Sequence, residues 1–147
     1  MSFQDAAMEV PITLRRWFVA HFVVDFFFGL PLLIAPAHFL RPLGWTAVDG
    51  ASARLVGAAL LAIGASSWFC RNAGIEVMKA LLDLKMVWSF AAIIGLLLSI
   101  GEGAPAPVWA FLSLFIAFFG VWTHYRIRFK QLAAAETMDD RLPSDDE

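Results

Sequence analysis

The chain has 147 residues, of which 60% are hydrophobic and 14% aromatic, and its mean hydropathy is +0.70. A single water-soluble domain of this length cannot bury that much apolar surface, so the composition excludes an ordinary soluble protein. The formal net charge of −2, with basic residues placed beside apolar runs, excludes a nucleic-acid-binding surface. We therefore expect the surplus apolar surface to face a lipid bilayer.

The N-terminal segment and the cysteine content exclude further kinds of protein. Residues 1–13 carry Asp5 and Glu9 and lack a basic region. This pattern argues against a cleavable signal peptide and predicts that the first apolar segment stays as an anchor. Cys70 is the only cysteine, which excludes an internal disulfide and a cysteine-rich metal site.

Four apolar segments are long enough to cross a bilayer as helices. A helix rises about 1.5 Å per residue, so about 20 apolar residues match a hydrocarbon core of about 30 Å. Short connections such as GEGAPA at residues 101–106 make neighbouring helices antiparallel. The sequence predicts an all-α polytopic membrane protein, an antiparallel four-transmembrane-helix bundle over residues 1–137, with helices at residues 15–35, 51–70, 78–100 and 107–130.

The basic and aromatic residues predict how these helices sit in the membrane. Most Lys and Arg residues lie at the end of the bundle that carries both termini, and such residues are retained on the cytoplasmic side. We therefore expect cytoplasmic N- and C-termini in a bacterial inner membrane, with an acidic, disordered tail over residues 138–147. Trp122 and Tyr125 are expected in the inner headgroup belt.

Each predicted helix carries a stripe of small and polar residues. In lipid such residues mark the faces that pack inward, because they permit close approach or hydrogen bonds between helices. The predicted inward faces are Phe18, His21, Asp25, Gly29 and Leu32 on the first helix, Arg54, Ala58, Ala62 and Ser66 on the second, Lys85, Trp88, Ser89, Ala92 and Ser99 on the third, and Ser113, Ala117, Gly120 and His124 on the fourth.

An acid and a base inside the bundle are the main candidates for a site. Counted along their helices, Asp25 lies about 12 Å and Lys85 about 10 Å from the cytoplasmic side. A charge near the bilayer centre costs about 2.5–3.5 kcal/mol, so opposite charges at one depth are expected to be partners. His21, Trp88 and His124 complete the predicted polar cluster.

Two interpretations of this cluster stay open. The acid and base can be a structural clamp that determines which helix meets which, or they can handle a ligand or a proton. No metal site is predicted, because no ligand motif such as HExxH is present. Outside the cluster, Arg54 is expected to pair with Asp49 or Glu102 as an outer-side anchor, and Lys79 with Asp83 at the inner interface.

The second predicted helix and its flanks read DGASARLVGAALLAIGASSWFCRN, an arginine followed by glycine and small residues and then an apolar run with another glycine. This segment resembles the second-helix signature of the DoxX-like group of small bacterial four-helix membrane proteins. The segment GLPLLIAP is similar to that group's first-helix ending. The resemblance implies a four-helix bundle, sometimes a membrane subunit beside a redox partner. His21 and Asp25 are similar to the intramembrane acids and histidines of the sterol-isomerase and sigma-2-receptor group, which serve a cationic ligand or intermediate.

The small size, the short loops and the lack of a catalytic motif predict a non-enzymatic accessory or scaffold subunit that self-associates or joins a larger membrane complex. No cofactor is predicted. One alternative is a small transporter or ligand-binding membrane protein with its site around Asp25, His21 and Lys85. The other is an intramembrane enzyme that uses Asp25 and His21 for proton transfer.

Overall fold

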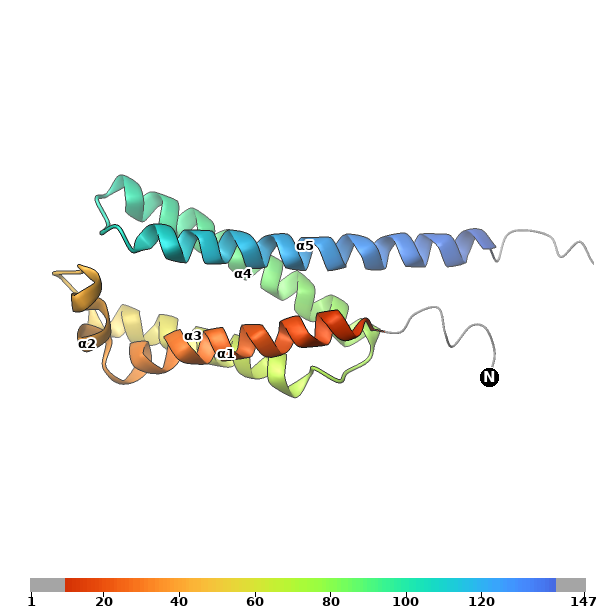
Figure 1. Cartoon of the computed structure of the whole chain (residues 1–147), viewed down its shortest axis with the longest axis horizontal. Coiled ribbons are helices and arrows are strands. Elements are labelled where there is room, and N and C mark those ends of the chain that lie inside the picture. The colour runs from red at the N-terminus through yellow and green to blue at the C-terminus, as the bar shows by residue number, and fades with distance from the viewer. Residues whose placement is uncertain (1–9, 140–147) are drawn as a thin grey trace, which may run out of the picture.

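The structure, a computed structural model, describes residues 10–139, with side chains described as far as residue 134 (Figure 1). Within this range it is all-α, and four of its helices are long and apolar enough to cross a membrane. The elements are α1 (Ile12–Ile34), α2 (Pro36–Leu40), the short 3₁₀ helix η2 (Arg41–Leu43), α3 (Gly50–Phe69), α4 (Ile75–Gly101) and α5 (Val108–Asp139). The predicted all-α four-helix membrane bundle is confirmed.

The helix bounds differ from the predicted ones mainly at the C-terminal end. Helix α5 continues to Asp139, past the predicted end at residue 130, because residues 131–136 are good helix formers. The prediction that the disordered tail begins at residue 138 is therefore wrong for Met138 and Asp139, which are helical. Residues 140–147 of the predicted disordered tail lie outside the described part of the chain. Helix α1 ends at Ile34 because Pro36 cannot continue its hydrogen-bonding pattern, and Pro36 instead begins α2.

The bundle consists of two layers, each a closely packed pair of helices: α1 with α3, and α4 with α5 (Figure 1). Glycines bring the backbones of the first pair into contact. A Cβ atom on Gly57 would lie 2.7 Å from the backbone nitrogen of Leu33 and 2.8 Å from the backbone oxygen of Gly29. Such close approach is how transmembrane helices gain packing energy without a hydrophobic driving force.

These contacts correct the predicted inward face of the second helix. Arg54, Ala58 and Ala62 are exposed, and the buried face is instead Gly57, Leu60, Gly64 and Ser67. The predicted stripe and the observed buried face both have helical spacing, so hydrophobic periodicity alone could not show which of them packs inward. The glycines decide the face because they allow the closest approach to α1.

The predicted inward face of the fourth helix is also wrong. Its small and polar residues are exposed: Ser113, Ala117, Gly120 and His124. Helix α5 instead buries large side chains, and the rings of Phe118 and Trp122 meet His21 and Phe18 of α1. The buried set includes Leu112, Phe118, Trp122, Tyr125 and Phe129. Because the layers are farther apart than two helices of one pair, bulky residues are needed to fill the space between them. Trp122 and Tyr125, which were expected in the inner headgroup belt, are instead buried between the helices.

The core lies at the end of the bundle where α1 begins, and the layers diverge toward α2. Leu14, Phe18, Met78 and Leu82 pack there with the aromatic residues of α5. The ring of Trp122 stacks on Phe118 at 5.6 Å and meets Phe18 edge-on at 5.8 Å. Figure 1 shows α4 starting beside α1 and leaving it toward the opposite end.

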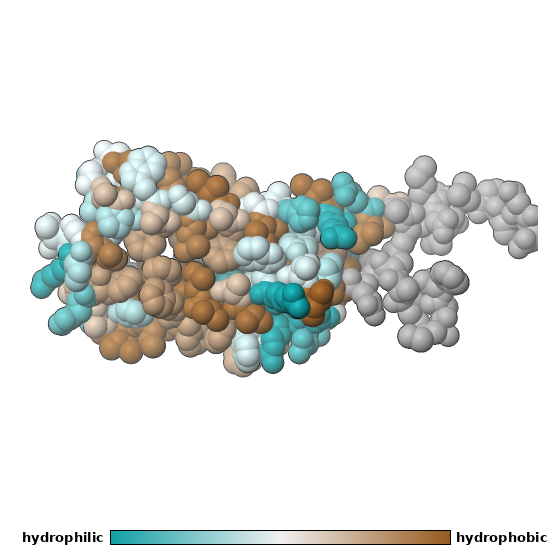
Figure 2. Space-filling view, viewed as in Figure 1, coloured by the Kyte–Doolittle hydropathy of each residue, from teal (hydrophilic) through white to brown (hydrophobic). Residues whose placement is uncertain are grey.

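The outer surface of the bundle is apolar. Figure 2 shows a broad hydrophobic surface across the helices, with hydrophilic residues concentrated toward the two ends. Large side chains exposed on this surface come from every spanning helix and include Val23, Phe27, Leu55, Val87, Leu98 and Ile116. With its four apolar helices, the chain is an integral membrane protein.

Ion pairs at the polar end differ from the expected Lys79–Asp83 pair. Lys79 contacts Glu76 at 2.7 Å, one turn before it on α4. Asp83 accepts two hydrogen bonds from Arg126 of α5, at 2.5 and 2.9 Å. Asp83 therefore joins the two helices of one layer, which a prediction limited to a single helix could not show.

The glycine contact between α1 and α3 is directly testable. Gly57→Ala places a methyl group against the backbone of α1, and we expect it to lower the free energy of unfolding by about 1–3 kcal/mol. The control is Gly120→Ala, because nothing lies within 4 Å of a Cβ atom there. Denaturant titration in detergent measures both variants, and equal effects would contradict the close contact.

Candidate functional site

A cluster of buried polar side chains lies where the two layers meet. His21 and Asp25 come from α1, one helical turn apart, Ser67 comes from α3 and Lys85 from α4. Each is at most 4% exposed, and Lys85 is completely buried. The structure thus brings together three of the predicted site residues, His21, Asp25 and Lys85.

Lys85 is held by groups from the three other spanning helices. Its Nζ atom donates to Ser67 Oγ at 2.5 Å and lies 3.4 Å from His21 Nδ1. The rings of Phe18 and Trp122 lie 5.1 and 5.4 Å from the same atom, within the range of cation–π attraction. An ammonium without water needs such partners, so Lys85 fastens the layers together.

Asp25 is positioned by the backbone of α3 and by His21. A Cβ atom on Gly64 would lie 2.7 Å from Asp25 Cβ, so only glycine leaves room for the acid at this crossing. His21 Nδ1 lies 2.9 Å from Asp25 Oδ2. The expected direct ion pair with Lys85 does not form; instead, Nδ1 of His21 contacts both the acid and the base.

One nitrogen of His21 therefore faces two neighbours. If Nδ1 carries a proton, it can donate toward Asp25, and if it does not, it can accept from Lys85. It cannot do both at once. The contact with Asp25 has the distance of an ion pair but lacks the alignment of a hydrogen bond, so Oδ2 has no hydrogen-bond partner in the described part of the protein.

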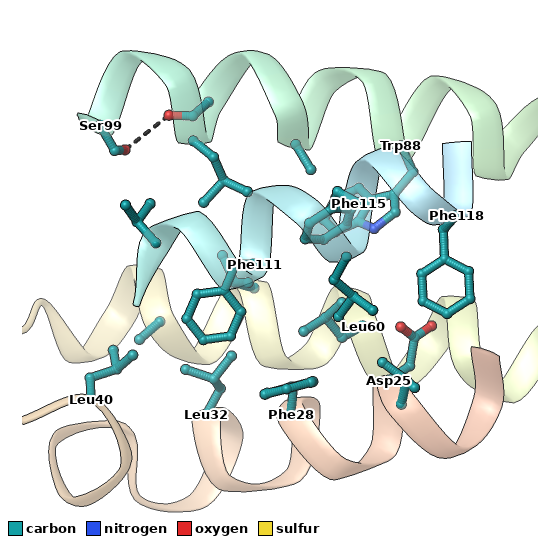
Figure 3. Close-up of a pocket in the computed structure, with 18 of the residues that line it drawn as sticks. Asp25, Phe28, Leu32, Leu40, Leu60, Trp88, Ser99, Phe111, Phe115 and Phe118 are labelled. Atoms are coloured by element: carbon teal, nitrogen blue, oxygen red, sulfur yellow. Dashed lines mark hydrogen bonds between the residues drawn. The ribbon is translucent and has the colours of Figure 1, made fainter. Parts of the chain in front are cut away.

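A cavity of about 470 Å³ begins at this acid and extends between the layers toward α2. Figure 3 shows Asp25 and Phe118 at one end of the cavity and Leu40 and Ser99 at the other. All four spanning helices contribute to its walls, which are mostly apolar and rich in aromatic rings. His21 and Asp25 form its polar end, while Lys85 lies behind them in the packed core.

Trp88 also faces this cavity. Its Nε1 atom is buried and has no hydrogen-bond partner among the described residues. Figure 3 shows the indole of Trp88 at the same end of the cavity as Asp25 and Phe118. Asp25 and Trp88, each of which carries one buried polar atom without a hydrogen-bond partner, therefore line the same end of the cavity.

The other predicted site residues lie elsewhere. His124 is exposed on α5 and meets the ring of Tyr125, because its face of the helix points away from the other layer. Asp49 caps the N-terminus of α3, and the Ser52 hydroxyl and backbone amides of residues 51 and 52 lower the pKa of its carboxyl group. Arg54 donates to the Gly50 carbonyl at 3.3 Å, not to Asp49 or Glu102.

Ser67 was missed by the sequence prediction. The stripe chosen for the second helix included Ser66, but the buried face of α3 contains none of the residues of that stripe. The signal available was the pair of glycines at positions 57 and 64, seven residues apart, with Ser67 three residues further. Among the described residues, no group of three or more His, Cys, Asp or Glu side chains is arranged to hold a metal ion.

No protein-family model matches the chain, and no curated protein or solved structure matches it significantly. The resemblance to the DoxX-like group therefore stays a prediction. The site has to be interpreted from its own geometry.

The connection from Lys85 through His21 to Asp25 can be tested by a double-mutant cycle. We expect Lys85→Met to destabilise the protein by about 3–5 kcal/mol, because it leaves a buried acid without its counter-charge. Asp25→Asn should also destabilise it, and the double variant should recover at least half of the summed loss. Unfolding in detergent measures all three, and strictly additive effects would contradict the coupling.

Proposed function

We propose that this membrane protein binds an apolar or amphipathic small molecule in the cavity between its two layers. The observation that carries the proposal is the cavity of about 470 Å³, whose apolar walls end at a buried carboxylate with an unsatisfied oxygen. Sites for small molecules are typically clefts of about 300–1,000 Å³ with apolar walls and a few convergent polar groups. This is the ligand-binding alternative from the sequence.

The shape of the bundle supports access from the lipid. On one side, rings of α1 and α5 close the gap, with Phe28 and Phe111 at 5.5 Å and His21 and Phe118 at 4.7 Å. On the other side, α3 and α4 are not a closely packed pair. Val56 of α3 is 46% exposed and Gly95 of α4 is exposed, yet both line the cavity. A molecule dissolved in the bilayer would enter between these two helices.

The accessory-subunit hypothesis remains a second candidate for one specific reason. The small residues Ser113, Ala117 and Gly120 of α5 are exposed on the outer surface, where they would permit close approach of a helix from another protein. Assembly with a second copy or a larger complex is compatible with ligand binding. The inner-membrane location, cytoplasmic termini and proton-transfer role for Asp25 and His21 also stay predictions.

A cavity-filling variant tests the proposed function. A photoreactive hexadecane that carries a diazirine is added to the protein in phospholipid nanodiscs, and labelling of the cavity walls is measured by peptide mass spectrometry. Labelling should saturate in the wild type and should be lost in Ala92→Trp, because Ala92 lines the cavity and a large side chain there occupies it.

The matched control is Ala91→Trp, since Ala91 is the exposed neighbour on the same helix and does not line the cavity. This variant should label like the wild type. Labelling that never saturates, or that is the same in both variants, would show that the cavity does not take up the probe and would overturn the proposed function.

A further inference from the structure

We propose that the molecule bound in this cavity is an uncharged lipid alcohol, whose hydroxyl group donates to Asp25 and accepts from Trp88. This inference rests on the proposed function and names its ligand class. It follows from the charge of the cluster and from two cavity-lining side chains, Asp25 and Trp88, that each carry a polar atom without a hydrogen-bond partner.

The charge of the buried cluster selects an uncharged head group. With Asp25 ionised, Lys85 protonated and His21 neutral, the three groups sum to zero. Burying a further ion costs several kcal/mol even after the surroundings relax. A protonated amine would place a second cation beside Lys85, and a fatty-acid carboxylate would place a second anion beside Asp25. An uncharged head group adds neither charge.

Among uncharged head groups, the hydrogen-bonding atoms of the site favour a hydroxyl. Asp25 Oδ2 needs a donor, and Trp88 Nε1, which can only donate, needs an acceptor. Both atoms belong to side chains that line the same end of the cavity (Figure 3). A hydroxyl group carries one donor and two acceptor lone pairs, which complement an acceptor and a donor of this kind. An ether or ester lacks the donor, and an alkane has neither group.

The rest of the cavity suits an apolar chain. From the polar end, it runs past the rings of Phe28, Phe115 and Phe111 to Leu40 at the α2 end, with few polar atoms along the way. Ser99, which is also part of the wall, already donates its hydroxyl to the Gly95 carbonyl at 2.9 Å. The Ser99 hydroxyl proton is therefore already used.

The test compares four compounds with the same chain length as competitors of the diazirine probe in nanodiscs: 1-hexadecanol, hexadecane, hexadecylamine and palmitic acid. We expect 1-hexadecanol to compete at least tenfold better than the other three, because hydrogen bonds to a buried charged acceptor and a buried donor add to a common apolar contact. Hexadecane competing as well as the alcohol would overturn this inference and leave the proposed function standing. Stronger competition by the amine or the acid would also overturn it. Failure of all four to compete would overturn both.

Trp88→Phe isolates the predicted acceptor contact, since it keeps an aromatic ring and removes only the Nε1 donor. The advantage of 1-hexadecanol over hexadecane should fall about tenfold in this variant. Trp109→Phe is the control, because Trp109 is exposed and lies outside the cavity walls. An unchanged advantage in Trp88→Phe would overturn the inference.

A spectroscopic measurement keeps the test independent of variant folding. In wild-type protein with ¹⁵N-labelled indoles, 1-hexadecanol should shift the Trp88 N–H resonance downfield and hexadecane should not. Equal shifts with both compounds would show that the indole donor does not sense a hydroxyl, which would overturn the inference.

Discussion

The structure depends on how the ammonium of Lys85 is satisfied without water. The side chain is completely buried in a bundle whose outer surface faces lipid, so its partners must come from the protein. Ser67 of α3, His21 and Phe18 of α1 and Trp122 of α5 supply them. Because these residues come from the three other spanning helices, one cation on α4 determines where the two layers must meet.

Because the layers meet at one point, the two ends of the bundle are packed differently. On the side of Lys85 where α1 begins, large apolar side chains close the space between the layers. On the other side the layers diverge, and a cavity remains. Asp25 lies at the boundary: it is coupled to the cation through His21, and it faces the cavity. The same residue can therefore be both part of the clamp and part of a site, which the sequence presented as alternatives.

Sequence reasoning was accurate where one helix carried a strong polar signal. The face of α1 followed from the spacing of His21, Asp25 and Gly29, and the predicted cluster of His21, Asp25 and Lys85 does come together. It failed for α5, because the rule that small residues face inward assumes that helices approach closely. Helix α5 faces the other layer across a wider gap, where Trp122 and other aromatic residues are needed. The cavity could not be predicted, since it depends on the divergence of the layers.

An experimental structure in nanodiscs with added 1-hexadecanol is the most direct test of this site. We expect density that begins between Asp25 and Trp88 and continues toward Leu40, with His21 still in contact with both Asp25 and Lys85. A cavity collapsed onto apolar side chains, with Asp25 paired directly to Lys85, would contradict this expectation and leave the cluster as a structural clamp.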